Sequence, residues 1–283
     1  SGAMGVGLLV GASFGVIDEC EVQGTVRGRV AVGGIAGGNA GRILHSRAAV
    51  RVQAMAAAGG LVGDMNGTVE ASSARVAIEA DKGAGGLVGL STYGSIIESR
   101  ADGTLRGADN LGGLVGLNTD ALVEGSEAQV TIEASGTNAG GAVGYSAQSL
   151  VRNVVAGGAV RGRHATGGLI GRNRGAVLDA YSTGSVAGES LVGGLVGDNA
   201  GGTVRGAYWD ATASGVTAGA GLARSREQLF ALTADAAQWD RARQGCRTRS
   251  SPTRADSRRR TTWVFDPGRD YPRLGCLPEE VSR

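Results

Sequence analysis

The chain contains few of the residues that form bulky cores and common active sites. Aromatic residues make up 4% of its 283 residues, and it has 4 prolines, 3 cysteines and 2 histidines. With so few rings, a core must be built from aliphatic and small side chains. No CxxC pair and no Cys/His cluster is present, so the sequence contains no zinc motif.

Long apolar runs and an excess of charge are missing as well. No run approaches the ~20 apolar residues of a membrane-spanning helix. The formal net charge is +2, which gives no overall attraction to nucleic acid or to a membrane surface. HExxH is absent, and the GxGxxG-like strings lack a strand–loop–helix context. We therefore expect no metal site, no cofactor and no catalytic residues.

Glycine, in contrast, is abundant and regularly placed. The chain has 52 glycines, and many belong to a recurring Gly-Gly-Leu-Val-Gly stretch. Successive closing glycines are 26, 26, 26, 27, 28, 27 and 26 residues apart. These closing glycines are Gly11, Gly37, Gly63, Gly89, Gly116, Gly144, Gly171 and Gly197. Such a regular period indicates a repeat architecture.

Other residue types keep the same phase in every repeat. A branched aliphatic residue follows each closing glycine by six or seven positions, and a small residue, mostly serine, comes three positions later. The aliphatic residues are Ile17, Ile43, Val69, Ile96, Val123, Val151, Val177 and Val204. Apolar residues alternate with period two in short segments, which indicates strands. The fold class we predict is all-β: a parallel β-solenoid of about eight coils with a small mixed α/β C-terminal cap.

Glycine and asparagine are expected to form the bends of each coil. The glycine pair permits either a positive φ or a tight corner that a Cβ would block. Asn39, Asn118, Asn173 and Asn199 each follow a closing glycine by two positions. Asparagine tolerates the left-handed region and can bond its own backbone, so we interpret these residues as a turn column. Because Val154 and Ala180 replace serine, we do not interpret the small column as a catalytic or ligand-binding array.

The repeat unit resembles a known family. Gly-Gly-Leu-Val-Gly-x-Asn followed by Val-x-x-Ser-x-Ala-x-Gly-x-Val is similar to the GLUG repeat, most clearly from Gly112 and at Gly193–Asn199. The likeness covers residues 5 to about 215. It implies a surface-exposed β-solenoid of large bacterial exoproteins, such as filamentous-haemagglutinin-like adhesins or the non-catalytic part of some IgA-cleaving metallopeptidases. It implies no catalytic residues.

The chain divides into three parts in this interpretation. Residues 1–4 look like the remnant of a cleaved purification tag, so the sequence is expected to be a piece of a longer protein. Residues 5–205 form the solenoid. Residues 206–283 form a capping region with an Arg-rich loop at 241–260. Residues 224–239 have helical composition, with Ser225 as N-cap and Leu229, Leu232 and Ala236 on one face.

Binding residues are predicted only in the capping region. The Arg-rich loop could contact an acidic polysaccharide or nucleic acid, or be a solvated loop, and the aromatic residues could be a sugar-stacking platform or a small core. The candidates for binding are Arg258, Arg259, Arg260, Trp209, Trp263 and Tyr271. Cys246 and Cys276 could form a disulfide if the protein is secreted, whereas Cys20 falls in the serine column.

Acidic residues form an irregular outward ladder just after the first aliphatic column. Glu70, Glu98 and Glu124 alternate there, irregularly, with Arg152 and Arg205. This arrangement is weakly similar to the charged faces of β-helix lyases and glycosidases. The sequence favours a non-enzymatic structural or adhesive module that is secreted or lies on a bacterial cell surface. Its partners would be a surface glycan, a host or bacterial surface protein, and the rest of a larger parent chain. The alternatives are a polysaccharide-processing β-helix enzyme and an accessory region of a GLUG-containing metallopeptidase.

Overall fold

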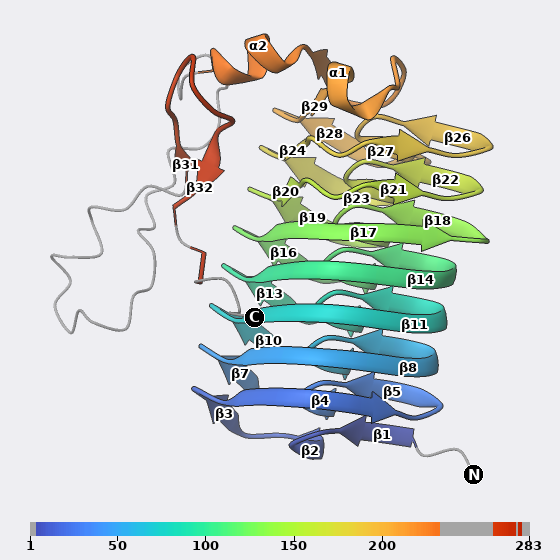
Figure 1. The fold of residues 1–283 in the computed structure, drawn as a ribbon, viewed down its shortest axis with the longest axis vertical. Coiled ribbons are helices and arrows are strands. Elements are labelled where there is room, and N and C mark those ends of the chain that lie inside the picture. Colours follow the sequence, from blue (N-terminus) through green and yellow to red (C-terminus); the bar gives the residue numbers. More distant parts are fainter. Residues whose placement is uncertain (1–3, 233–262, 276, 279–283) are drawn as a thin grey trace, which may run out of the picture.

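A computed structural model describes residues 4–232, 263–275 and 277–278. They form a parallel β-solenoid of about eight turns that ends in a short cap with two helices (Figure 1). The predicted fold class is confirmed. Every strand pair of the solenoid is parallel, and the strands lie in a sixteen-stranded and a fourteen-stranded sheet.

The turns share one order of strands. The first four turns contain β1 (Met4–Gly7), β2 (Val10–Ser13), β3 (Val16–Asp18), β4 (Glu21–Arg27), β5 (Val30–Gly33), β6 (Ala36–Asn39), β7 (Arg42–Leu44), β8 (Arg47–Gly59), β9 (Val62–Met65), β10 (Thr68–Glu70), β11 (Ser73–Gly85), β12 (Val88–Thr92), β13 (Ser95–Ile97) and β14 (Arg100–Gly112). Strands β8, β11 and β14 are long because each one spans a bend and serves two successive turns.

The remaining turns follow the same course with more interruptions. They contain β15 (Val115–Thr119), β16 (Leu122–Glu124), β17 (Glu127–Ala134), β18 (Thr137–Gly140), β19 (Val143–Arg152), β20 (Val155–Ala156), β21 (Val160–Arg161), β22 (His164–Gly167), β23 (Ile170–Leu178), β24 (Tyr181–Ser182), β25 (Val186–Ala187), β26 (Ser190–Gly193), β27 (Val196–Asp198), β28 (Thr203–Arg205) and β29 (Tyr208–Asp210). The cap contains α1 (Ala211–Ser214), β30 (Leu222–Arg224), α2 (Arg226–Phe230), β31 (Trp263–Val264) and β32 (Arg273–Leu274).

Equivalent residues lie directly over one another, as the repeat predicts. Val69 pairs with Ile96 and Ile96 with Val123, and all three are fully buried. The core is a single aliphatic column that runs from Val26 to the ring of Trp209. Because successive rungs are ~4.8 Å apart, each inward side chain packs mainly on its counterparts one turn before and one turn after.

The glycine pair forms a tight corner rather than a left-handed one. Neither glycine of any pair has a positive φ. A Cβ at Gly60 would lie 2.2 Å from the carbonyl oxygen of Gly86, its counterpart in the next turn, and a Cβ at Gly59 would lie 2.0 Å from the carbonyl oxygen of Val62. Of the two reasons that the sequence left open for the glycines, close approach of the backbone is therefore the correct one.

Left-handed residues also form a short column of Tyr93, Asp120 and Gln148 and two long columns. One lies two residues before each glycine pair and contains Gly5, Ala31, Ala57, Gly83, Asn110, Asn138, Ala165 and Leu191. The other lies just before the serine column and contains Glu19, His45, Ala71, Glu98, Gly125, Asn153, Asp179 and Gly206. Sequence pattern does not reveal these columns, because glycine and asparagine occupy only some of their positions.

The predicted asparagine turn column is partly confirmed. The side chain of Asn39 bonds both the N–H and the carbonyl of Gly41, and Asn173 does the same with Gly175. Neither has a positive φ, so the expectation of a left-handed backbone was wrong there. Asn39, Asn118 and Asn173 are buried, and Asn173 donates a 2.8 Å hydrogen bond to Asn199 in the next turn. Here asparagine fixes the bend through its side chain.

The cap closes the C-terminal end of the core. Trp209 is inward-facing and 3% exposed, and its indole N–H donates to the carbonyl of Val216 at 3.1 Å. A second apolar cluster lies beside the last turns and includes Tyr181, Tyr208, Leu229 and Trp263. Ser225 is the N-cap of α2, as predicted, and it forms a capping box with Gln228, but α2 ends at Phe230. Ala236 and the rest of the expected helix lie outside the described residues.

Candidate functional site

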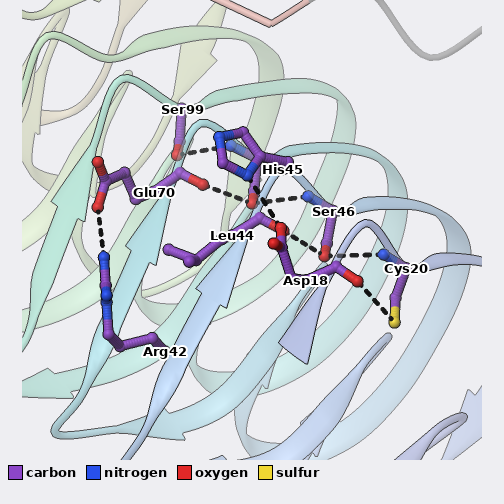
Figure 2. Close-up of polar contacts among 9 residues, drawn as sticks. Asp18, Cys20, Arg42, Leu44, His45, Ser46, Glu70 and Ser99 are labelled. Carbon is purple, nitrogen blue, oxygen red and sulfur yellow. Dashed lines mark hydrogen bonds and ion pairs between the residues drawn. The ribbon is translucent and has the colours of Figure 1, made fainter. Parts of the chain in front are cut away.

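The serine column is a structural ladder inside the wall of the solenoid. Figure 2 shows part of it. The hydroxyl of Ser46 donates to the carbonyl of Leu44 at 2.7 Å and accepts the N–H of Cys20 from the previous turn at 3.1 Å. Ser72, Ser99 and Ser126 repeat both bonds. These hydroxyls are saturated by backbone groups, so they are poorly suited to act as nucleophiles.

Beside that ladder, charged side chains connect neighbouring turns (Figure 2). Nδ1 of His45 lies 2.9 Å from Oδ1 of Asp18, and the guanidinium of Arg42 lies 3.3 Å from the carboxylate of Glu70. Both histidines have a partner one turn away, because Nδ1 of His164 lies 2.8 Å from the hydroxyl of Ser190. These contacts tie turns together and do not converge on one point.

The outward acidic ladder predicted from sequence is present only in part, because Glu70 is buried. Strand register places Glu70, Ile97, Glu124, Arg152, Leu178 and Arg205 in one column on the β7–β10–β13 face. Glu98 is not a member, because it lies one residue later, in the left-handed column. Arg152 and Glu124 form an ion pair at 2.7 Å.

A second ladder runs along the face made by β4, β8, β11, β14 and β17. It consists of Arg27, Gln53, Glu79, Arg106 and Glu133, and we call it the charged ladder. Arg27 donates to Gln53 at 2.6 Å, Gln53 donates to Glu79 at 3.0 Å, and Arg106 pairs with Glu133 at 2.9 Å. Side chains held by their neighbours in this way present a pre-ordered row of donors and acceptors.

Two open hollows lie along the charged ladder. One, of about 190 Å³, is lined by Arg51, Ala77, Ile78, Glu79, Thr104 and Arg106. The other, of about 360 Å³, is lined by Gln53, Ala54, Glu79, Ala80, Asp81, Arg106 and Gly107. Arg106 and Glu79 line both. The hollows with these two residues are the candidate site, which sequence reasoning missed because the charges in this column change sign irregularly.

No protein-family model, no curated protein and no solved structure matches this chain. The resemblance to the GLUG repeat therefore remains a prediction that rests on the repeat unit itself. The site has to be judged from its own chemistry. Within the described ranges, no group of three or more His, Cys, Asp or Glu side chains is placed to hold a metal ion. No helix in that part of the chain is long and apolar enough to cross a membrane.

The structure buries two of the predicted binding aromatics, Trp209 at the end of the solenoid core and Trp263 in the second apolar cluster. Trp209 is 3% and Trp263 is 5% exposed, so neither ring has a free face on which a sugar could stack. The prediction that they bind a ligand is therefore wrong, and both are core residues. Trp263 also donates its indole N–H to Asn153 at 2.9 Å. Tyr271 is half-buried and stacks on Tyr181. Arg258, Arg259, Arg260, Cys246 and Cys276 lie outside the described residues.

Asp210 connects the cap to the last turn of the solenoid. Its side chain is fully buried, caps α1 through the N–H groups of Thr212 and Ala213, and accepts the hydroxyl of Tyr271 at 2.5 Å. Burial alone raises the pKa of Asp210. The bonds from Tyr271, Ala213 and Thr212 and the charge of Arg226 outweigh burial and lower its pKa below the ordinary value. Burial and the contact with Asp210 raise the pKa of Tyr271 to about 12.

Acid is therefore expected to loosen the cap. Because the pKa of Asp210 is lower in the folded than in the unfolded state, its stabilising contribution is complete above about pH 4 and is lost as pH falls through the folded pKa. Asp210→Asn should lower the free energy of unfolding by about 1–3 kcal/mol at pH 7. In the variant, the free energy of unfolding should also fall less steeply as the pH drops below 4. Urea unfolding of both proteins at pH 7 and pH 3 tests this. An equally steep acid decline in the variant would contradict the assignment.

Proposed function

We propose that this chain is a non-enzymatic structural and adhesive β-solenoid module of a secreted or surface-anchored bacterial protein, and that the charged-ladder face contacts a glycan. The observation that carries the proposal is the charged ladder with its two hollows. Adjacent rungs supply donors and acceptors on a stiff parallel sheet, and two groups of them, Arg27–Gln53–Glu79 and Arg106–Glu133, are already bonded internally. A long polar ligand that lies along the axis would order few side chains on binding, which lowers the entropic cost.

The chemistry of the hollows suits saccharide hydroxyls. Arginine has a planar fork of donors that is always charged; Arg51 lies in the same column as Thr104, and Arg106 lies in the same column as Glu79. Carboxylate, guanidinium and hydroxyl groups together can both donate to and accept from a sugar ring. The repeat unit's likeness to GLUG exoproteins also supports a location outside the cell and a larger parent chain.

The test is retention of the protein on a glycan array and on bacterial and host cells. The double variant Arg51→Ala/Arg106→Ala should bind about tenfold more weakly or worse, because each hydrogen bond to a charged group contributes about 1.5–3 kcal/mol. Arg174→Ala is the matched control, since Arg174 is exposed on β23 of the fourteen-stranded sheet, away from the charged ladder. Equal binding by all three proteins, or binding by none, would contradict a role for this face.

A polysaccharide-processing enzyme is the second candidate, favoured by one observation. Glu79 and Asp81 both line the larger hollow, and paired carboxylates are the usual groups for glycoside hydrolysis. Reducing-end assays on a panel of acidic and neutral polysaccharides separate the two functions. Turnover that disappears in Glu79→Gln or Asp81→Asn would replace the adhesive proposal. Binding without turnover would support it.

A further inference from the structure

A row of polar side chains lies inside the middle turns, in the column that Asn39 and Asn173 occupy elsewhere. Strand register places Ser91, Asn118 and Ser146 directly over one another, and all three are fully buried. The two serine hydroxyls and both polar atoms of the Asn118 amide lack a hydrogen-bond partner among the described residues. Buried polar groups nearly always have a partner, so this row needs one that the described chain does not supply.

The bend after each of these three residues is longer than the bends that asparagine closes by itself. Four positions separate Asn39 from the next aliphatic core residue, whereas five separate Ser91, Asn118 and Ser146 from theirs. Each longer bend contains a residue with a left-handed backbone, and these residues are Tyr93, Asp120 and Gln148. The unpaired side chains and the longer bends therefore occur in the same three turns.

The longer bend takes away the backbone groups that the other asparagines bond. The Asn39 amide bonds the N–H and the carbonyl of Gly41, two positions further on. The residue two positions after Asn118 is Asp120, and its N–H donates instead to the carbonyl of Ala147 in the next turn. The Asn118 amide thus remains in the interior with two N–H donors and an acceptor oxygen that no backbone group bonds.

We infer that buried water molecules lie along Ser91, Asn118 and Ser146 and bridge the three turns. Successive rungs are ~4.8 Å apart, and one water with two hydrogen bonds of ~2.8 Å spans up to ~5.6 Å. Water fits this row because the amide N–H groups need an acceptor and the amide oxygen needs a donor, whereas a cation would serve only the oxygens. Buried waters typically make about three bonds to polar groups that are otherwise unpaired.

A crystal structure of the unsubstituted protein, at a resolution that shows ordered solvent, tests the inference directly. We expect solvent density about 2.7–3.0 Å from both polar atoms of the Asn118 amide and from the hydroxyls of Ser91 and Ser146. Three results would overturn the inference: direct hydrogen bonds among the three side chains, an interior without solvent density, or a cation surrounded only by oxygen ligands.

Substitutions test whether the three side chains share their partners. Asn118→Met introduces the residue that already fills this column at Met65, where it is 1% exposed. Loss of the amide breaks the bridges and leaves the hydroxyls of Ser91 and Ser146 unpaired, so the Tm should fall by about 3 °C or more. The triple variant Ser91→Ala/Asn118→Met/Ser146→Ala should regain part of that loss, because it leaves no polar group of the row unpaired.

Thermal denaturation followed by circular dichroism compares these variants. A higher Tm in Asn118→Met would mean that the amide is unpaired in a dry core, and a Tm that is lower still in the triple variant would mean that the three side chains act independently. Either result would contradict the bridging waters. Ser46→Ala is the matched control, because that hydroxyl bonds only backbone groups. Its effect on the Tm should be the same with and without Asn118→Met.

Discussion

Gly113→Ala is expected to prevent the middle of the solenoid from closing. A Cβ at this position would lie 2.0 Å from the carbonyl oxygen of Gly141 in the next turn and 2.7 Å from the Cβ of Ala128. Both obstacles belong to the wall of the stack, so relief requires the backbone of adjacent turns to separate. We expect a loss of at least about 4 kcal/mol, the range reached only by severe overpacking or strain, and a fall in Tm of about 10 °C or more.

Gly38→Ala is the matched control for that substitution. A Cβ at Gly38 has its nearest neighbour at 4.0 Å, and the aligned positions in later turns hold Asp64, Leu90, Leu117 and Tyr145. Gly38→Ala should change the free energy of unfolding by no more than about 0.5 kcal/mol. Thermal denaturation followed by circular dichroism compares the two variants. If the two variants have the same Tm, the inference that the corners of adjacent turns approach closely is wrong.

Trp209→Ala is expected to open the C-terminal end of the core. The ring packs against Gly194, where an added Cβ would lie 2.1 Å from Cδ1 of the indole, and on its other side the strand of Trp209 pairs with the short strand β30. Removing a buried tryptophan costs about 3–5 kcal/mol. Because each turn contacts mainly its neighbours, the loss should stay local at first and spread from this end.

Hydrogen exchange locates the effect of that variant. Amides of β28, β29 and β30 should exchange much faster in Trp209→Ala, while those of β8 and β11 should keep their protection. Trp209→Phe retains a ring but loses the bond to Val216 and some buried volume, so it should lower the free energy of unfolding by about 1–3 kcal/mol, less than Trp209→Ala. Uniformly faster exchange along the whole chain would show that the stack unfolds as one unit and that Trp209 is not a local seal.

The repeat predicted the architecture because packing constrains every turn alike. Val69, Ile96 and Val123 recur at one phase since each must fill the same thin core, and Trp209 stood out because it breaks a column of small residues. The left-handed columns could not be predicted, because Ala57, Ala71 and Leu191 carry no local signal for that conformation and are held in it by the turns on either side.

The charged ladder was missed for a related reason. No single residue type fills the column of Arg27, Gln53, Glu79, Arg106 and Glu133, so the repeat pattern does not mark it as a site. Asp210 and Tyr271 are 61 residues apart, and no repeat relates them. Contacts of this kind depend on how the chain folds back, which a periodic pattern does not encode.

Spin-label distances along one outer column test the stacking most directly. One outer column contains the exposed residues Thr25, Thr131 and Ser185. Thr131 lies four rungs and Ser185 six rungs from Thr25. Labels at Thr25 and Thr131 should lie ~19 Å apart and labels at Thr25 and Ser185 ~29 Å apart, at ~4.8 Å per rung. Dilution with unlabelled protein restricts the measurement to distances within one chain. Distances that do not grow in proportion to the number of rungs would contradict the in-register solenoid.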